Sequence, residues 1–384
     1  MRIGIITYWQ SNDNYGQQLQ CWALQHYLKL NGHDPFLIRF KRFERKLTFR
    51  DRIKKTLKTL LKIILVKPYI SERKAKELDF KRQSDRDFVG FRRDFLAVSD
   101  SSYTDLETIR HYPPMADAYI TGSDQVWNYD LTEEELRAYL LQFGESNIRR
   151  ISYAPSIAHK SIPATKEFIY EECLKDFSAI SVREPDGVSA LKKLGYDAEL
   201  VLDPTLLLHD YDYIEAFNIK VRQQGEPYVF IYSLNYESES DLPMKYIRNV
   251  ASNNQAKIIV TPSSGFLPAL ELFDGVTYKY QSVPDWVSCI GNSQLVVTAS
   301  FHGVVFSILF HKNFIFTPLK GNLKESNNRA LNIINKLGLE QTIWNGCYEP
   351  EFDFHIDWSD VDKKLNNLRT KSISFIRRAL NKMD

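Results

Sequence analysis

The stretch Leu295–Phe316, LVVTASFHGVVFSILFHKNFIF, decides the fold of this chain. Its first four residues form a short β-branched apolar run, which predicts a buried parallel strand. Ala299–Gly303 breaks the run, Val304–Phe310 predicts an apolar helix, and Asn313–Phe316 predicts the next strand. The stretch therefore indicates an α/β fold in which strands and helices alternate.

His302 lies at the carboxyl end of this predicted strand, where α/β proteins place their chemistry. The next helix presents free N–H groups and a partial positive charge, which favour an anion at this position. Histidine is also the side chain that titrates near neutral pH. The alternative is a core histidine whose ring nitrogens are satisfied, and the strand-end position alone leaves both interpretations open.

Length and composition narrow the class of protein. The length of 384 residues indicates two domains, and the 43% hydrophobic and 26% charged residues are ordinary for a globular protein. The net charge of +2 does not indicate a nucleic-acid partner. The four cysteines form no C-x-x-C pair, which is typical of reduced thiols in a cytosolic protein. We expect a cytoplasmic protein, because we find neither a signal peptide nor an apolar run of the about eighteen residues that a membrane span needs.

The first forty residues show the same alternation. Ile3–Thr7 predicts a strand, residues 10–15 form a polar loop, and Gly16–Leu30 predicts a helix that ends before Gly32. Asp34–Phe40 then predicts the second strand. The loop does not contain G-x-G-x-x-G, so the dinucleotide-binding fingerprint is absent.

A basic segment, Arg39–Lys76, differs in composition from the rest because it is rich in lysine and arginine and has few acidic residues. Its apolar residues recur at helical spacing, with the lysines mostly on the opposite side: Ile53, Leu57, Leu60, Leu61 and Ile64. A basic amphipathic helix over residues 52–65 would dock on an anionic membrane surface. The alternative is a solvated helix that packs its apolar side on its own domain. The first interpretation predicts a peripheral protein on the inner membrane face.

Two further strand ends carry polar residues. The strand Ala118–Ile120 leads into Thr121–Asn128, where Gly122 permits close backbone approach and Ser123 or Asp124 can cap the next segment. The predicted strand Ala179–Val182 leads into Arg183, which is suited to a two-point grip on a carboxylate or phosphate. An ordinary turn in the first case, and a salt bridge from Arg183 to Glu184 or Asp186 in the second, are the structural alternatives.

The second half repeats the pattern after a polar passage, His209–Pro227, that we interpret as a linker. Tyr228–Leu234 and Lys257–Val260 predict strands. A helix opening at Asn327 is predicted to stop at Gly338, and the final helix is predicted to begin at Ser359, with Asp362 completing a capping box. We therefore expect two Rossmann-like domains that face a cleft.

The expected domain bounds are set by these elements. An N-terminal domain spans residues 1–208 and contains a basic helical insertion around 41–95, in which Phe80–Phe95 predicts a charged helix. A C-terminal domain spans residues 226–345, and a helix within 355–384 packs back on the N-terminal domain.

Five motifs together resemble the polysaccharide pyruvyl transferase family, in its subgroup with S-F-H-G. They cover roughly residues 1–340 in family order: N-Y-G-x-x-L-Q-x-x-A-L at Asn14–Leu24, G-S-D-Q-V-W-N at Gly122–Asn128, S-V-R-E at Ser181–Glu184, L-D-P-T at Leu202–Thr205 and S-F-H-G at Ser300–Gly303. The resemblance implies two Rossmann-like domains arranged as in glycosyltransferase-B folds. It also implies transfer of pyruvate from phosphoenolpyruvate onto two hydroxyls of a sugar, which forms a ketal and releases phosphate.

The resemblance also implies residue roles. Arg183 matches a binder of phosphoenolpyruvate, and His302 matches an acid in the transfer. Many members have Arg-Leu-His where this chain has Ser300-Phe301-His302, so one donor-binding arginine is missing. Arg329 or the helix N-terminus after His302 would supply the missing charge.

The remaining candidate site residues are proposed because they lie near the ends of predicted strands. Asp124 is a candidate base for the sugar hydroxyl, since general base catalysis needs a positioned proton acceptor. The other residues expected to bind substrate are Asn14, Gly16, Ser123, Ser300 and Gly303. We expect no metal site and no cofactor beyond phosphoenolpyruvate as donor substrate. The expected acceptor is a sugar of an exopolysaccharide or its lipid-linked oligosaccharide precursor.

Two other functions remain open from the sequence. The first is a glycosyltransferase of the same fold that uses a nucleotide sugar, and the donor requirement of product formation distinguishes it. The second is a non-catalytic glycan-binding or assembly subunit, which Ser300 in place of arginine makes conceivable.

Overall fold

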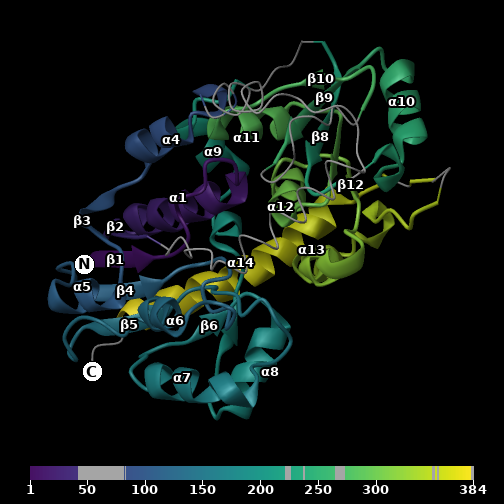
Figure 1. Ribbon diagram of the computed structural model, residues 1–384. Coiled ribbons are helices and arrows are strands. Elements are labelled where there is room, and N and C mark those ends of the chain that lie inside the picture. The colour runs from purple at the N-terminus through teal and green to yellow at the C-terminus, as the bar shows by residue number, and fades with distance from the viewer. Residues whose placement is uncertain are drawn as a thin grey trace, which may run out of the picture.

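The computed structural model describes residues 1–41, 82, 84–220, 226–236, 238–263, 273–347, 351–352 and 354–381. It shows two α/β halves side by side (Figure 1). The predicted membrane-docking segment, residues 52–65, and most of the helical insertion expected around 41–95 lie outside the described residues.

The N-terminal half is built on a five-stranded parallel sheet of order β3-β2-β1-β4-β5. Its strands are β1 (Arg2–Ile6), β2 (Asp34–Phe40), β3 (Val98–Tyr103), β4 (Ala118–Thr121) and β5 (Arg149–Ser152). The central strands are apolar and almost completely buried, as expected of parallel strands with both faces covered. A short parallel pair, β6 (Ser181–Val182) and β7 (Glu199–Leu200), continues the structure beyond β5.

The helices described for this half connect its strands or come after them: α1 (Tyr15–Leu30), α4 (Phe88–Phe95), α5 (Leu106–His111), α6 (Glu133–Tyr139), α7 (Ala164–Leu174) and α8 (Pro185–Lys193). The charged helix predicted over Phe80–Phe95 is described at residues 82 and 84–95, and there it is interrupted at Asp87. Asp87 has a left-handed backbone, with φ of 42°, and its carboxylate accepts a hydrogen bond from the N–H of Gly90. An N-cap therefore interrupts the helical run, and α4 begins only at Phe88.

The C-terminal half repeats the architecture with sheet order β10-β9-β8-β11-β12, again parallel. Its strands are β8 (Tyr228–Ser233), β9 (Lys257–Pro262), β10 (Thr277–Tyr278), β11 (Leu295–Thr298) and β12 (Phe314–Phe316). The α-helices described for it are α10 (Met244–Asn253), α11 (Val283–Gly291), α12 (Phe301–Leu309) and α13 (Asn328–Leu337). Two sheets of this kind confirm the predicted pair of Rossmann-like domains.

Two predicted boundaries are wrong for local reasons. Helix α12 begins at Phe301 and not at Val304, because the Ser300 side chain caps it by accepting a hydrogen bond from the N–H of Gly303. The predicted linker contains helix α9 (Asp210–Ala216), which Tyr213 anchors by burying its ring and donating its hydroxyl to the Thr205 carbonyl at 2.9 Å.

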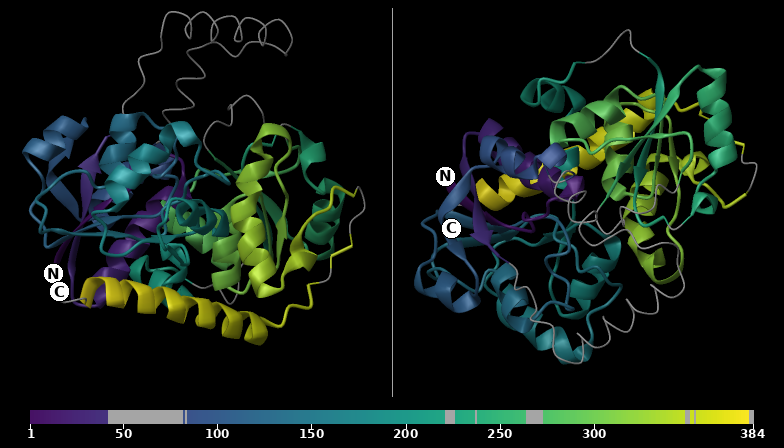
Figure 2. Two further views of the ribbon diagram at one scale, coloured as in Figure 1. Left: turned by 90° about the horizontal axis from the view of Figure 1, so that it is seen from below. Right: turned by 45° about the horizontal axis from the view of Figure 1, so that its top comes forward.

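The last helix, α14 (Trp358–Asn381), crosses from the C-terminal half to the N-terminal half and runs along both (Figure 2). The buried Arg369 donates to the carbonyls of Leu206 and Leu208, at 2.8 and 3.2 Å. The predicted capping box of Ser359 and Asp362 is not formed. Asp357 instead accepts a hydrogen bond from the N–H of Asp360, and Asp362 pairs with His311.

Aromatic rings fill the contact between the halves. Tyr15 of α1 stacks on Trp286 of α11, with ring centroids 5.2 Å apart, and donates its hydroxyl to the Gln281 carbonyl at 2.7 Å. Burial raises the pKa of Tyr15 well above its ordinary value. Such a packed interface holds the two halves in register around the site. Among the described helices, none is both long and apolar enough to cross a membrane.

Candidate functional site

His302 lies in the first turn of α12, at the point where the two halves meet. Its ring rests on the backbone of Gly16, so closely that a Cβ on Gly16 would be 2.0 Å from Nδ1. The other ring nitrogen, Nε2, lies 3.7 Å from Oδ1 of Asp203 and is buried without a hydrogen-bond partner among the described residues. The alternative of a fully satisfied core histidine therefore does not describe this ring.

Asp203 is the buried carboxylate beneath the site, and its side chain is fully enclosed. Oδ1 accepts hydrogen bonds from the hydroxyl and the N–H of Thr205, at 2.7 and 3.1 Å. Oδ2 accepts from Ser123 at 2.8 Å and from Nη1 of Arg183 at 2.6 Å. Burial alone would raise the pKa of Asp203, but hydrogen bonds and the charges of His302 and Arg183 hold it far below its ordinary value.

Asp203 was not among the residues that we expected in the site. It lies in the L-D-P-T motif, at the end of the run Leu200–Leu202, so the strand-end position that singled out His302 could also have singled it out. The signal was weak because aspartate before proline is also an ordinary turn.

Arg183 is mostly occupied by partners of its own half. Nε pairs with Glu184 at 3.1 Å, Nη1 binds Asp203 and Ser123, and the guanidinium centre lies 5.2 Å from the Phe301 ring centroid. Nη2 is buried and has no hydrogen-bond partner within the described part of the chain. The salt bridge to Glu184 that we considered as the structural alternative is thus present.

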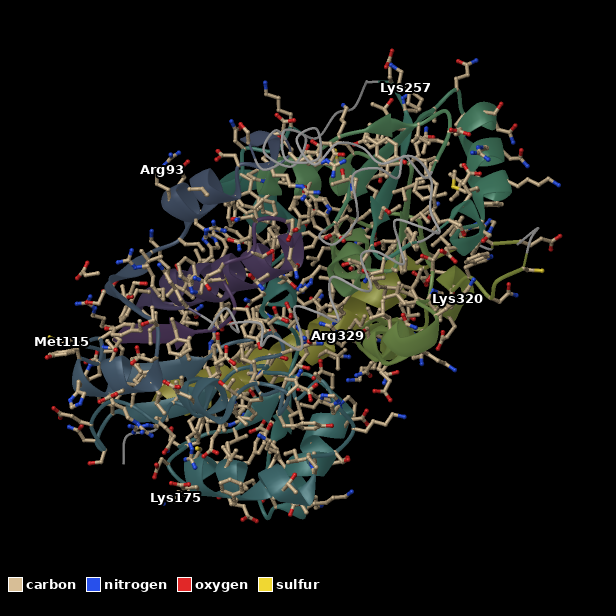
Figure 3. The ribbon with its side chains drawn as sticks, viewed as in Figure 1. Arg93, Met115, Lys175, Lys257, Lys320 and Arg329 are labelled. Atoms are coloured by element: carbon tan, nitrogen blue, oxygen red, sulfur yellow. The ribbon has the colours of Figure 1, made fainter. Side chains whose placement is uncertain are left out.

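Arg329, in the first turn of α13, lies in the middle of the molecule between the two halves (Figure 3). Its guanidinium makes no hydrogen bond or ion pair with any residue that the structure describes. Burial and the nearby charge of Arg183 lower the pKa of Arg329. An unpaired cation beside a second cation is unfavourable without a counter-charge, so this position favours an anionic ligand.

We call the space in front of His302 the His302 pocket. It has a volume of about 230 Å³, and both halves line it. The predicted residues that line it are Asn14, Asp124, Ser300, His302 and Arg329. Other lining residues come after the carboxyl ends of β8 and β9, so the pocket lies where both sheets end.

Two helix N-termini meet at this pocket. The side chain of Asn14 caps α1 by accepting from the N–H of Gln17 at 3.1 Å, and Ser300 caps α12 in the same way. The remaining first-turn N–H groups and the helix dipoles place positive potential here. Together with Arg329 they make the His302 pocket suitable for an anion.

Asp124 lines the same pocket from the end of β4 and has an unusual backbone, with φ of 83°. Oδ1 accepts a hydrogen bond from the N–H of Gln125 at 2.8 Å. A left-handed non-glycine residue at a strand end is a costly conformation that occurs often at functional sites.

Four predicted substrate-binding residues do not line the His302 pocket, and the first of them is Arg183, described above. Ser123 is buried against Asp203 and Arg183, and Gly16 lies beneath the His302 ring. Gly303 packs on Thr298 of β11, whose side chain would be 2.7 Å from an added Cβ. All four support residues of the site from behind.

Comparison with known proteins agrees with the motifs. The family model for polysaccharide pyruvyl transferase matches residues 14–319. No curated protein sequence matches the chain.

Similar solved structures include UDP-GlcNAc 2-epimerase from Neisseria meningitidis bound to UDP-GlcNAc, with 9% identity, TM-score 0.45 and coverage of 99% of this chain and 94% of that one. A putative UDP-N-acetylglucosamine 2-epimerase from Listeria monocytogenes has 10% identity, TM-score 0.48 and coverage of 100% and 97%. An alpha-glucosyltransferase in complex with UDP and DNA has 10% identity, TM-score 0.47 and coverage of 99% and 93%. The family match extends over most of the chain, from the N-cap of α1 to the loop after β12, and the chain therefore belongs to the polysaccharide pyruvyl transferase family.

Proposed function

We propose that this protein transfers the pyruvyl group of phosphoenolpyruvate onto two hydroxyls of one sugar, in a polysaccharide or its lipid-linked precursor. The observation that carries the proposal is the His302 pocket in a chain of this family. Arg329, which has no hydrogen bond or ion pair among the described residues, lines that pocket together with the His302 side chain and two helix N-termini. A donor that carries both a phosphate and a carboxylate needs such a combination of groups.

The chemistry needs proton transfer at two places. One sugar hydroxyl adds to C2 of phosphoenolpyruvate while a proton is delivered to the methylene carbon, which becomes a methyl group. The second hydroxyl then attacks the same carbon, and the bond to the phosphate oxygen breaks. The products are the ketal and inorganic phosphate, and the proton of the second hydroxyl balances the departing phosphate.

We assign the proton donor to His302 and the charge-stabilising groups to Arg329 and the first turns of α1 and α12. The buried carboxylate of Asp203 lies 3.7 Å from Nε2. A positioned acid typically contributes about 10²–10⁴-fold to the rate. Charge stabilisation in a site of low dielectric contributes in addition.

Asp124 is the candidate base for the attacking hydroxyl. One of its oxygens is occupied by a backbone N–H, which leaves the other oxygen for a ligand in the pocket. Arg183 holds Asp203 in place behind the His302 pocket, and its buried Nη2 has no hydrogen-bond partner among the described residues.

The experiment that tests this function is incubation of the purified protein with phosphoenolpyruvate and candidate saccharides. We expect phosphate release that depends on the saccharide, and a product whose mass corresponds to one added pyruvate ketal. If UDP-sugars support product formation and phosphoenolpyruvate does not, the protein is a glycosyltransferase. If saccharides bind and no donor gives a product, it is a non-catalytic glycan-binding subunit.

A further inference from the structure

A second pocket, of about 220 Å³, lies on the other side of Arg329. We call it the Asp186 pocket. Both halves contribute to its wall, and the lining residues that matter here are Gln125, Asn128, Asp130, His159, Asp186 and Glu325. Ser326 and Arg329 line both this pocket and the His302 pocket, so ligands in the two pockets would lie next to each other.

The wall of the Asp186 pocket is rich in hydrogen-bond acceptors. Asp186 lies in the first turn of α8, and Glu325 lies in the 3₁₀ turn before α13. Within the described residues, neither carboxylate makes a hydrogen bond or ion pair through its side chain. Amide side chains add further acceptors and donors. Such a surface suits a ligand with many hydroxyl groups.

His159 forms a fixed part of the same wall. Nε2 lies 3.0 Å from both the side-chain amide oxygen Oδ1 of Asn128 and Oδ2 of Asp130, and the ring stacks on Tyr129 with centroids 4.1 Å apart. The His159 ring thus contacts two residues of the wall, Asn128 and Asp130, and stacks on Tyr129 between them. A site whose side chains are already positioned binds its ligand at a smaller entropic cost.

The charges of this pocket select the class of ligand. The acidic residues that line it are Asp130, Glu184, Asp186 and Glu325, against Lys160 and the shared Arg329, and Glu184 is paired with Arg183. An anionic donor would be repelled by these carboxylates, whereas hydroxyl or ammonium groups donate hydrogen bonds to them. Arg329 lines both pockets and Lys160 lines the Asp186 pocket alone. Four carboxylates line the Asp186 pocket, against those of Asp13 and Asp124 in the His302 pocket, so the Asp186 pocket is the more acidic of the two.

We infer that the Asp186 pocket binds the acceptor, and that it selects a neutral or amine-bearing sugar over a sugar that carries a carboxylate. The inference rests on the proposed function, because it names the acceptor class of the same reaction. The sugar would extend past Ser326 and Arg329 and present its two hydroxyls to the donor in the His302 pocket.

The test measures binding, which does not depend on turnover. Three probes are used with the full-length protein: the methyl glycosides of galactose, galactosamine and galacturonic acid. Binding is followed by saturation-transfer NMR and titration. The neutral and amine-bearing glycosides should bind the wild type, and the acidic glycoside should bind at least roughly tenfold more weakly, since two nearby carboxylates each contribute on the order of fivefold.

Asp186→Asn with Glu325→Gln removes both charges and keeps the side-chain shapes. This double variant should bind the acidic glycoside almost as well as the neutral one. Glu171→Gln on the outer side of α7 removes an exposed carboxylate elsewhere and should leave the wild-type preference unchanged.

Three results would overturn the inference. These are failure of all three glycosides to bind, preference for the acidic glycoside in the wild type, and an unchanged preference in the double variant. If turnover with phosphoenolpyruvate is observed and the double variant alters only the KM for that donor, the pocket holds the donor and the inference also fails. Absence of turnover with the predicted binding pattern would instead refute only the proposed reaction.

Discussion

The ring of His302, in the C-terminal half, lies against the backbone of Gly16, in the N-terminal half, in the space that a side chain at position 16 would occupy. A Cβ there would be 2.0 Å from Nδ1. The absence of a side chain at Gly16 therefore brings α1 and α12 together and positions Nε2 beside Asp203. Gly16 is needed here for close approach and not for backbone freedom, since it lies inside helix α1.

Gly16→Ala should lower kcat at least about tenfold, because the added methyl group displaces the proton donor, and small misplacements of reacting groups are costly. Alanine is favoured over glycine in a helix by roughly 1 kcal/mol, so the local helix is not weakened. Steady-state kinetics and thermal unfolding measure the two effects separately. Leu30→Ala, at the exposed end of the same helix, is the control and should leave kcat unchanged. A Gly16→Ala enzyme with wild-type kcat would show that the ring can move without consequence.

Asp203→Asn should destabilise the protein at neutral pH by about 3–5 kcal/mol, since it removes one partner of a buried ion pair. The folded-state pKa of Asp203 lies below its unfolded value, so the carboxylate contributes stability above the unfolded pKa of about 3.9. This contribution is lost as the pH falls through the folded-state pKa. The difference in unfolding free energy between wild type and Asp203→Asn should therefore shrink below about pH 4.

Urea unfolding at several pH values measures this difference. Asp34→Asn, at an exposed position, should give curves that track the wild type at every pH. A destabilisation by Asp203→Asn that stays constant down to the lowest accessible pH would contradict the role of the ionised carboxylate.

His302→Gln should lower kcat by about 10²–10⁴-fold, because glutamine keeps a polar side chain of similar size but cannot deliver a proton. Asp203 keeps its hydrogen bonds from Ser123, Arg183 and Thr205 in this variant, so the melting temperature should fall less than in Asp203→Asn. Phosphate release with saturating substrates is the measurement. His111→Gln, at an exposed position on α5, serves as control. Turnover close to wild type in His302→Gln would remove the assignment of proton donor.

Arg329→Met should raise the Kd for phosphoenolpyruvate about 10–100-fold, which corresponds to the loss of one charge-assisted hydrogen bond of roughly 1.5–3 kcal/mol. The same change should keep or raise the melting temperature, because it removes a cation that lies near Arg183 and has no ion-pair partner among the described residues. Calorimetric titration and thermal unfolding give the two quantities. A loss of stability with unchanged donor affinity would make Arg329 a structural residue.

Arg183→Lys should lower both donor affinity and stability. A lysine ammonium cannot reproduce the fork that binds Glu184 through Nε and Asp203 through Nη1. The same two measurements as for Arg329→Met apply. Arg329→Met should lower donor affinity without loss of stability, whereas Arg183→Lys should lower both. Arg183→Lys with wild-type stability and affinity would show that a single positive charge is enough at this position.

Much of the fold could be predicted because it depends on local patterns. The strand Leu295–Thr298 has the bounds that its β-branched run predicts, and β2 also has the bounds that its apolar run predicts. The helix end at Gly338 could be predicted because glycine is favoured just after a helix, where the backbone is left-handed. Gly338 has this backbone, with φ of 72°. The errors occurred where one side chain decides a boundary, as Asp87 does for α4 and Ser300 does for α12.

The residues of the candidate site show the same difference between what local sequence patterns determine and what tertiary packing determines. The sequence by itself determined that polar residues such as Asn14, Asp124 and His302 come after strand ends, because the order of strands and helices along the chain is a local property. Only the tertiary structure decided that His302 rests on Gly16 and lies beside Asp203, and that Arg329 has no ion-pair partner among the described residues while Arg183 has two. The reason is that hydrophobic periodicity reports which side chains are buried. The partner of a buried charge depends on how distant elements pack against one another.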